Sequence, residues 1–439
     1  MAGTGSSLCF RTMPSFRARQ DYERPPIETI VRQHVEAVTC LSIVRATLLD
    51  SPHVKLHHLD RLDNRLTAHL DGLAVAGEFG WRLCESALAD AGRGEIFTGT
   101  VRALEDGSAD RLDHLLAVAE AAPALLSGVI AAFNWVSAQW LQGAILGLLN
   151  AKSATRLLIG IAACRLHQVD PGVPLAIALT ADDVRLRAFA LRAASECGRI
   201  ELLPACLEAL DDADTDCRFH AASAAALLGD RQRALRALES IASERGPTQM
   251  YALRLLLKLL PLQQAAPILN TLSGDPTNRR TLLKAVGAAG DPYYIPWLID
   301  QMADLEVTRL AGESFSMITG ADLAWLDLER KPPAGFESGP NDDPTDDDVG
   351  MDDDENLPWP DPERVARWWH ANEHRFQAGH RYFMGAPPSP AHCVQVLRDG
   401  YQRQRMAAAQ YLCLLQPGTK LFNCAAPAWR QRRWLDRLA

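Results

Sequence analysis

The feature that most constrains the fold is a sequence period of 31 residues. Anchor residues stand at Arg156, Arg187, Arg218, Gln249 and Arg280, each 31 positions after the one before. A last copy starts 29 positions further on, at Arg309. A fixed period in this range is typical of solenoids, in which each helical hairpin buries its apolar face against its neighbours. The period therefore predicts an all-α fold with an α-solenoid of helical hairpins at its centre.

One unit shows the hairpin in full. Its predicted first helix covers residues 187–196, the turn begins at Gly198, and the second helix covers 202–210. The following unit has the same layout, with helices predicted at 218–228 and 234–241. The turns between units are rich in Asp, whose side chain can cap the free N–H groups at the start of a helix. Each unit is thus predicted to be helix, short turn, helix and polar turn.

The anchor arginines allow two interpretations. Each follows a polar turn, so stacking would bring it near carboxylates of an adjacent unit. One interpretation is a structural ladder of Arg–Asp pairs that fixes the register between units, and the other is a row of anion-binding sites. We favour the ladder, because the position recurs in every unit whereas a binding site need not. The ladder residues are Arg156, Arg187, Arg218, Arg280 and Arg309.

The composition of the first 320 residues predicts three consecutive regions. Residues 1–26 are predicted to be disordered and to lack a secretory signal, because they contain no apolar stretch of useful length. Residues 27–120 carry apolar side chains at helical spacing and are predicted to form a helical N-terminal domain. The solenoid is predicted to cover 121–320. Its uncharged start, 121–151, is long enough to cross a bilayer, but it contains proline and amide side chains, so we expect a buried hairpin and no membrane span.

Residues 321–358 are predicted to form an acidic, disordered linker, because the segment has few apolar residues to bury. Nine acidic residues lie between positions 341 and 355, and without them the remaining 45 acidic residues equal the 45 lysines and arginines. The net charge of −9 therefore belongs to this segment. The rest of the chain has no overall field that would attract nucleic acid or an anionic membrane.

Residues 359–439 are predicted to form a basic, aromatic, helical C-terminal cap. This region has 12 lysines and arginines against 5 acidic residues. Three interpretations remain open: the tryptophans are core, the region is a protein-binding surface, or its arginines and aromatic rings bind nucleic acid. We favour the first and regard nucleic acid as the weakest. The candidate partner-binding residues are Trp359, Trp368, Trp369, Arg309 and Glu313.

Motifs that would indicate catalysis are missing from the sequence. It contains no glycine-rich phosphate loop, no HExxH motif and no nucleophile elbow. The ten cysteines form no CxxC pair, and most lie in apolar helical patterns where a reduced thiol acts as a small core residue. We therefore name no catalytic, cofactor-binding or metal-binding residues, expect no cofactor, and regard an enzyme as the less favoured class.

Several stretches carry a family resemblance. The units at 182–198 and 211–229 resemble the HEAT-like repeats first described in phycobilisome lyases, with an Asp-rich turn, an arginine and an Ala-rich helix that ends near glycine. The chain as a whole resembles a bacterial family of HEAT-like repeat proteins often encoded near type VI secretion genes. That resemblance is carried by residues 59–77, 218–230, 309–320, 357–369 and 381–385. No catalytic residues are established for that family, so the resemblance implies none here.

The function predicted from these observations is a cytoplasmic scaffold for protein–protein interaction. Its solenoid would present a concave face to a protein partner. The resemblance implies that the partner could be a component or effector of a type VI secretion system. Two alternatives stay open: a lyase-type enzyme or ligand-binding protein with a pocket between the N-terminal domain and the solenoid, and nucleic-acid binding through the basic C-terminal region.

Overall fold

The chain is all-helical. The structure is a computed structural model that describes residues 25–334, 336, 339 and 350–438. Within these residues the regular elements are α-helices and short 3-10 turns, and β-structure is limited to isolated bridges. The predicted disordered N-terminus falls almost wholly outside the described residues, and so do positions 340–349 of the predicted linker.

The N-terminal helices build one core with the start of the array. They are α1 (Glu28–Leu48), α2 (Leu56–Ala87), α3 (Arg93–Glu105), α4 (Ala109–Ala121) and α5 (Leu126–Trp135). The predicted leucine stripe of α2 is buried, with Leu59 and Leu66 both 0% exposed. The same core reaches Ile159 and Ala163, which lie beyond the domain boundary predicted at residue 120. The N-terminal region and the array therefore share apolar packing.

The array consists of inner and outer helices. The inner helices are α7 (Ala154–Leu166), α9 (Val184–Glu196), α11 (Thr215–Leu227), α13 (Gln249–Leu259), α15 (Arg279–Ala289) and α17 (Thr308–Thr319). The outer helices are α6 (Ala144–Leu149), α8 (Val173–Ala178), α10 (Leu203–Glu208), α12 (Arg233–Ser243), α14 (Leu262–Ser273) and α16 (Ile295–Gln301). Each inner helix contacts the next inner helix and at least one outer helix. The anchor position of the 31-residue period lies in the first turn of each inner helix.

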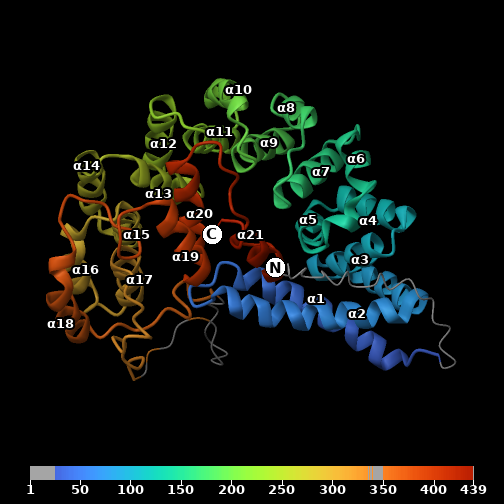
Figure 1. The fold of residues 1–439 in the computed structure, drawn as a ribbon, viewed down its shortest axis with the longest axis horizontal. Coiled ribbons are helices and arrows are strands. Elements are labelled where there is room, and N and C mark those ends of the chain that lie inside the picture. The colour runs from blue at the N-terminus through green and yellow to red at the C-terminus, as the bar shows by residue number, and fades with distance from the viewer. Residues whose placement is uncertain (1–24, 335, 337–338, 340–349, 439) are drawn as a thin grey trace, which may run out of the picture.

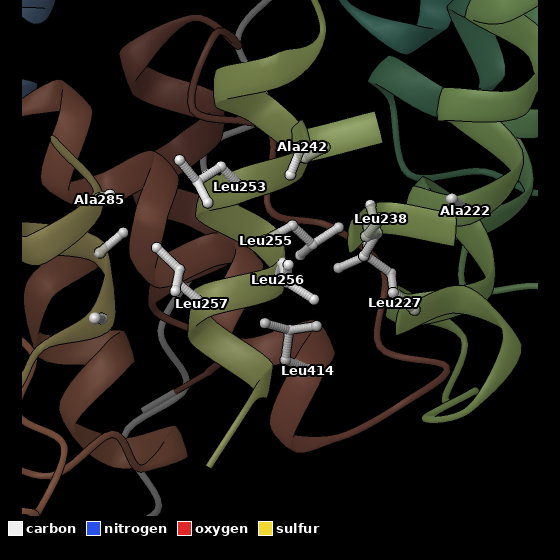
Figure 2. Packing of buried hydrophobic residues seen from close by; sticks show 14 of the residues in the cluster. Ala222, Leu227, Leu238, Ala242, Leu253, Leu255, Leu256, Leu257, Ala285 and Leu414 are labelled. Carbon is white, nitrogen blue, oxygen red and sulfur yellow. The ribbon is translucent and has the colours of Figure 1, made fainter. Parts of the chain in front are cut away.

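Local sequence explains why the inner helices start and stack as they do. The side chain of Asp183 accepts a hydrogen bond from the N–H of Leu186, and Asp214 does the same for Cys217, so both act as the predicted caps. Small side chains at the contact, such as Ala190 and Ala222, are fully buried and let α9 and α11 approach closely. Figure 2 shows the leucines of α13 packed between neighbouring helices of the same core.

The C-terminal helices fill the inside of the arc. They are α18 (Pro362–Asn372), α19 (Pro390–Asp399), α20 (Gln402–Leu415) and α21 (Ala428–Leu435). Figure 1 shows the chain following an arc from α1 and α2 through α8 and α10 to α16 and α18, with α19, α20 and α21 enclosed by it. Helix α20 contacts α11, and α21 contacts α2. The concave face that we expected to meet a partner is therefore partly covered by the chain's own C-terminal region.

The start of α20 joins the two ends of the arc. Tyr401 forms a β-bridge with Lys55, and the N–H of Gln402 donates to the carbonyl of Val54 at 2.7 Å. The Tyr401 hydroxyl also donates to the carboxylate of Asp322, just after α17, at 2.9 Å. The Lys55 ammonium lies 3.3 Å from the same carboxylate. Residues from the N-terminal hairpin, the end of the array and the C-terminal region thus meet at one point.

Glycines at the ends of inner helices receive the C-terminal segment. Gly290 ends α15 with a φ of +75°, and a Cβ there would lie 2.3 Å from the carbonyl oxygen of Tyr382. Gly320 ends α17 in the same way, and its Cβ would lie 2.6 Å from the carbonyl oxygen of Met384. Glycine is required at these positions for two reasons: the backbone is left-handed, and the carbonyls of Tyr382 and Met384 lie too close for a side chain. These two glycines therefore end the inner helices and also allow residues 382–385 to dock against them.

Membrane-spanning helices are not found among the described residues. No single helix there is long and apolar enough to cross a bilayer. The helical stretches Ala109–Ala121 and Pro123–Trp135 reach that length and composition only as a pair bent by 119°.

Candidate functional site

The anchor arginines form pairs, but their partners vary along the array. The guanidinium of Arg187 lies 2.7 and 3.1 Å from the two carboxylate oxygens of Asp212, in the turn of the next unit. That pair raises the pKa of Arg187 and lowers the pKa of Asp212. Arg156 instead pairs with Glu120 and Asp113 of the preceding region, and Arg218 donates to main-chain carbonyls of its own turn, including that of Asp212 at 2.8 Å. The Arg187–Asp212 pair has the geometry that the ladder requires.

The last two anchors bind the acidic segment. The guanidinium of Arg280 lies 2.9 and 2.6 Å from the carboxylate oxygens of Asp354. Arg309 binds Asp352 at 2.6 and 3.0 Å and lies 4.8 Å over the ring of Trp359. Asp354 is only 3% exposed. The described end of the predicted disordered linker is thus held against the array, because carboxylates at this spacing meet two guanidinium groups in fork geometry.

The residues proposed for partner binding are largely engaged within the chain. Trp359 is 7% exposed and Arg309 is 8% exposed. The ring of Trp368 packs on Phe315 with centroids 5.7 Å apart, and Trp369 lies beside Phe376. The carboxylate of Glu313 lies 2.9 Å from Arg403 of α20. The structure brings Arg309 and Trp359 into contact and assigns the other three to separate internal contacts.

Arginines of the C-terminal region bind carbonyls at helix ends. Arg381 donates to the carbonyls of Leu257, Lys258 and Ala289, at 2.8, 2.6 and 3.0 Å. Arg430 donates to the carbonyls of Asn134 and Val136, at 2.7 and 2.6 Å. These carbonyls lie at the negative ends of helices and have no intrahelical partner, which explains why cations cover them. The arginines in question are therefore not free to meet the phosphates of a nucleic acid.

A different set of basic residues lies one helical turn further along the inner helices. Arg192 of α9 follows the anchor Arg187, Arg254 of α13 follows Gln249, and Lys284 of α15 follows Arg280. With the neighbouring His220 of α11 and Tyr251 of α13, these residues form what we call the inner basic surface: Arg192, His220, Tyr251, Arg254 and Lys284. Within the described residues, neither Arg254 nor Lys284 makes a hydrogen bond or an ion pair, and both side chains are half-buried.

Burial and neighbouring charges both act on the ionisable groups of this surface. Burial, and then the charges of Arg280 and Arg254, lower the pKa of Lys284. Burial also lowers the pKa of Arg254, which Glu313 partly counters. Burial, and then the charge of Arg192, lower the pKa of His220 to about 4, so this ring is neutral at pH 7. The side chain of Arg192 is 50% exposed and that of Tyr251 is also open to solvent.

The inner basic surface has acidic neighbours at both sides. Glu196 accepts from Arg192 at 2.6 Å and also pairs with Arg165. Burial alone would raise the pKa of Glu196, but Arg165 and Arg192 lower it to about 2. Glu313, paired with Arg403, acts on the charge of Arg254 from the other side. The two unpaired cations, Arg254 and Lys284, therefore lie between arginine-paired carboxylates at either side.

Two cavities lie elsewhere. One of about 510 Å³ is enclosed by α1, α3 and α5 and lined by Arg45, Asn134 and Trp135. The carbonyl of Ala425 accepts hydrogen bonds from both Arg45 and Asn134, so these polar groups are already satisfied. The other, of about 600 Å³, lies between α14, α15 and α16 and is lined mainly by apolar and aromatic side chains. The first cavity is lined by α1 and α3 of the predicted N-terminal domain and by α5 of the predicted solenoid, so it lies where a pocket between these two regions was expected.

In the described part of the chain, no side chains are arranged as ligands for a metal ion, and the buried thiols belong to the core. It contains no group of three or more His, Cys, Asp or Glu side chains arranged to hold a metal ion. Burial raises the pKa of Cys206 to about 12, and it acts in the same direction on Cys197 and Cys413. These thiols are protonated at neutral pH and belong to the core.

Comparisons with known proteins assign no family. No family model, no curated protein and no solved structure matches the chain.

The inner basic surface was not predicted from the sequence. A signal for it exists, because Arg192, Arg254 and Lys284 interrupt helices that are otherwise rich in alanine and leucine, one turn after the anchor position. Read singly, each residue looks like an ordinary solvated charge. Only the stacking of α9, α11, α13 and α15 brings them to one face.

Proposed function

We propose that the chain is a scaffold for protein–protein interaction, built as an α-solenoid of HEAT-like hairpins. One observation carries the proposal: the inner helices of the array already bind a polypeptide segment at their ends, the chain's own residues 381–385, which turn tightly at Met384 and Gly385. Their main chain bonds to the ends of inner helices, with the N–H of Tyr382 donating to the carbonyl of Gly290 and that of Met384 to the carbonyl of Met317, both at 2.8 Å. Free main-chain groups at the ends of the inner helices can thus bind the main chain of a polypeptide, which supports a role in binding a partner protein.

The same observation limits where a partner can bind. The C-terminal region occupies the concave side at the C-terminal ends of the inner helices. The inner basic surface lies mostly in the middle of those helices, where Arg192 and Tyr251 are exposed. The partner site proposed here is therefore this remaining part of the concave side, and the tryptophans of the C-terminal region serve mainly as core.

The identity of the partner follows from the family resemblance alone. If the chain shares the setting of that bacterial family, its partner is a cytoplasmic protein of a type VI secretion system or an effector that passes through it. The physical argument for a scaffold does not depend on this link.

The test is crosslinking in the native host. The full-length tagged chain is crosslinked through lysine, purified, and analysed by mass spectrometry beside an untagged control. We expect one reproducible protein crosslinked to Lys284 of the inner basic surface, and few crosslinks to Lys152, which lies exposed at the start of α7. Recovery of no protein above the control, or crosslinks that avoid Lys284 altogether, would overturn the proposal.

A further inference from the structure

We infer that the inner basic surface binds an acidic polypeptide segment of the partner, through carboxylates that meet Arg254 and Lys284. This inference rests on the proposed function and names the chemistry of the partner. It starts from a contrast within the array. Arg187, Arg280 and Arg309 each bind a carboxylate in fork geometry, whereas Arg254 and Lys284 have no partner in the described part of the chain.

The unpaired cations repel one another in this arrangement. Lys284 faces the positive charges of Arg280 and Arg254 and, with smaller effect, the carboxylates of Asp353 and Asp354, while Arg254 faces the carboxylate of Glu313 and the positive charge of Arg403. Like charges that are partly shielded from water raise the free energy of the unbound state. A bound carboxylate would remove that repulsion and replace it with charge-assisted hydrogen bonds.

The chain shows how its array binds acidic peptide. Residues 352–354 lie across α15 and α17, where Arg309 binds Asp352 and Arg280 binds Asp354. The N–H of Asp354 also donates to the carboxylate of Asp352 at 2.9 Å, so the segment is held in a compact turn. Arg254 and Lys284 continue this row of cations onto α13 and the next turn of α15. The most fitting occupant is therefore a second acidic segment, supplied by the partner.

Aromatic rings near the cations indicate which other residue types the partner's acidic segment carries. The ring centroid of Phe219 lies 6.3 Å from that of Tyr251, which is 63% exposed. Elsewhere in the chain, Arg309 lies over the ring of Trp359, which shows that the array combines cations with aromatic rings when it binds its own C-terminal segment. An occupant with aromatic or large apolar residues between its acidic ones would use both features.

A nucleic acid fits less well. Its phosphates form an unbroken line of negative charge, whereas this surface offers two unpaired cations between the arginine-paired carboxylates of Glu196 and Glu313. Separate carboxylates can be spaced to avoid these acids. Binding of nucleic acid is therefore treated as an outcome that contradicts the inference.

The experiment measures binding of a fluorescein-labelled peptide rich in Asp with interspersed Phe to the full-length protein, by fluorescence anisotropy. The comparison ligands are the same peptide with Asn in place of Asp and single-stranded RNA and DNA oligonucleotides. We expect the acidic peptide to bind at least about tenfold more tightly than the Asn peptide, and binding to weaken as salt is raised. Equal binding of the two peptides, or tighter binding of an oligonucleotide, would overturn the inference.

Substituted proteins test whether Arg254 and Lys284 form the binding site for the acidic peptide. Arg254→Ala combined with Lys284→Gln is expected to weaken binding of the acidic peptide by about tenfold or more. The control combines Arg245→Ala and Arg367→Ala, which remove two exposed arginines that lie on the loop after α12 and on α18. An equal loss in the control, or no loss in the test variant, contradicts the inference.

A covalent readout covers the case in which the double variant does not fold. A water-soluble carbodiimide joins a carboxylate to a lysine amine at contact distance, so the acidic peptide should form an amide with Lys284 of the wild-type protein. Crosslinks to Lys152 or Lys420 with none to Lys284 would refute the site. If the acidic peptide fails while host crosslinking still recovers a partner at Lys284, the scaffold proposal stands and only the acidic chemistry is refuted.

Discussion

The carboxylate of Asp354 lies 2.6 and 2.9 Å from two nitrogens of Arg280, a residue 74 positions earlier in the chain. Asp354 is 3% exposed, whereas its neighbour Asp353 is exposed. The hydrogen bond to Asp354 raises the pKa of Arg280. A segment dominated by negative charge is thereby fixed to the array through a buried carboxylate.

Asp354→Asn is expected to lower the free energy of unfolding by about 1–3 kcal/mol, because it leaves the Arg280 guanidinium without its charged partner. The measurement is urea unfolding, with hydrogen exchange to follow residues 350–358. Asp353→Asn removes the same charge at the adjacent, exposed position and should change stability by less than about 0.5 kcal/mol. Equal effects of the two substitutions would contradict a specific Arg280–Asp354 pair.

Gly290→Ala should be strongly destabilising, by about 2–4 kcal/mol, because the new methyl group would meet the carbonyl of Tyr382. Gly107→Ala is the matched control. Gly107 has a φ of +65° and nothing within 4 Å of the added Cβ, so only the backbone strain of about 1 kcal/mol remains. Thermal unfolding of both variants separates strain from steric clash. A Gly290→Ala protein as stable as the control would show that residues 382–385 do not dock as described.

Arg381→Ala is expected to cost about 2–4 kcal/mol and to loosen the C-terminal region, because it strips several carbonyls at the ends of α13 and α15 of their donor. Limited proteolysis should then cut the C-terminal region earlier than in wild type. Arg375→Ala removes an exposed arginine whose hydrogen bond, to Asn372, is local. That control should digest like wild type, and early cutting in both proteins would argue against an anchoring role for Arg381.

His167 should make stability depend on pH. Burial, and then the charge of Arg430, lower its pKa to about 4, and its Nε2 lies 2.8 Å from the carbonyl oxygen of Phe133. Because the folded pKa lies below that of the unfolded chain, the unfolded state binds the proton first. Neutral His167 therefore makes its full contribution to the free energy of unfolding above pH 6.5. That contribution is lost as pH falls toward 4, by roughly 2–3 kcal/mol.

His167→Gln tests this pH dependence. Glutamine can still donate to the carbonyl of Phe133 but does not titrate. The variant should unfold close to wild type at pH 7 and be the more stable of the two at pH 5, as measured by urea unfolding at both values. A variant that shows the full wild-type loss between pH 7 and pH 5 would assign the dependence to other groups.

Local features of the fold were predictable from the sequence. Asp361 followed by Pro362 is a typical helix start, and in the structure the Asp361 side chain accepts from the N–H groups of Glu363 and Arg364. Predicted inner helices end within a residue of those observed, since α9 ends at Glu196 and α11 at Leu227. These features depend on neighbours a few residues apart, which helical period and capping chemistry capture. The all-helical class follows from the same signals.

Contacts between distant segments were not predictable. The carbonyls of Ala425 and Ala426 bind Arg45, which lies 380 and 381 positions earlier. The sequence near Arg45 is an ordinary amphipathic helix, so nothing local marks its partner. The same reason explains why the tryptophans were assigned to partner binding. The sequence around Trp359 does not show whether its ring contacts a partner or Arg309 of the same chain. The inner basic surface was missed because its members come from several helices and only stacking unites them.

The meeting of Tyr401, Lys55 and Asp322 fixes how many hairpins this protein can have. An open stack can gain or lose a unit at modest cost, because each unit touches only its neighbours. Here the hydroxyl of Tyr401 and the ammonium of Lys55 lie 2.9 and 3.3 Å from one carboxylate beyond the last hairpin. Inserting or deleting a unit would move Asp322 away from the N-terminal hairpin and break the junction. The repeat number is therefore expected to be invariant in descendants of this gene, even where the sequence of individual hairpins drifts.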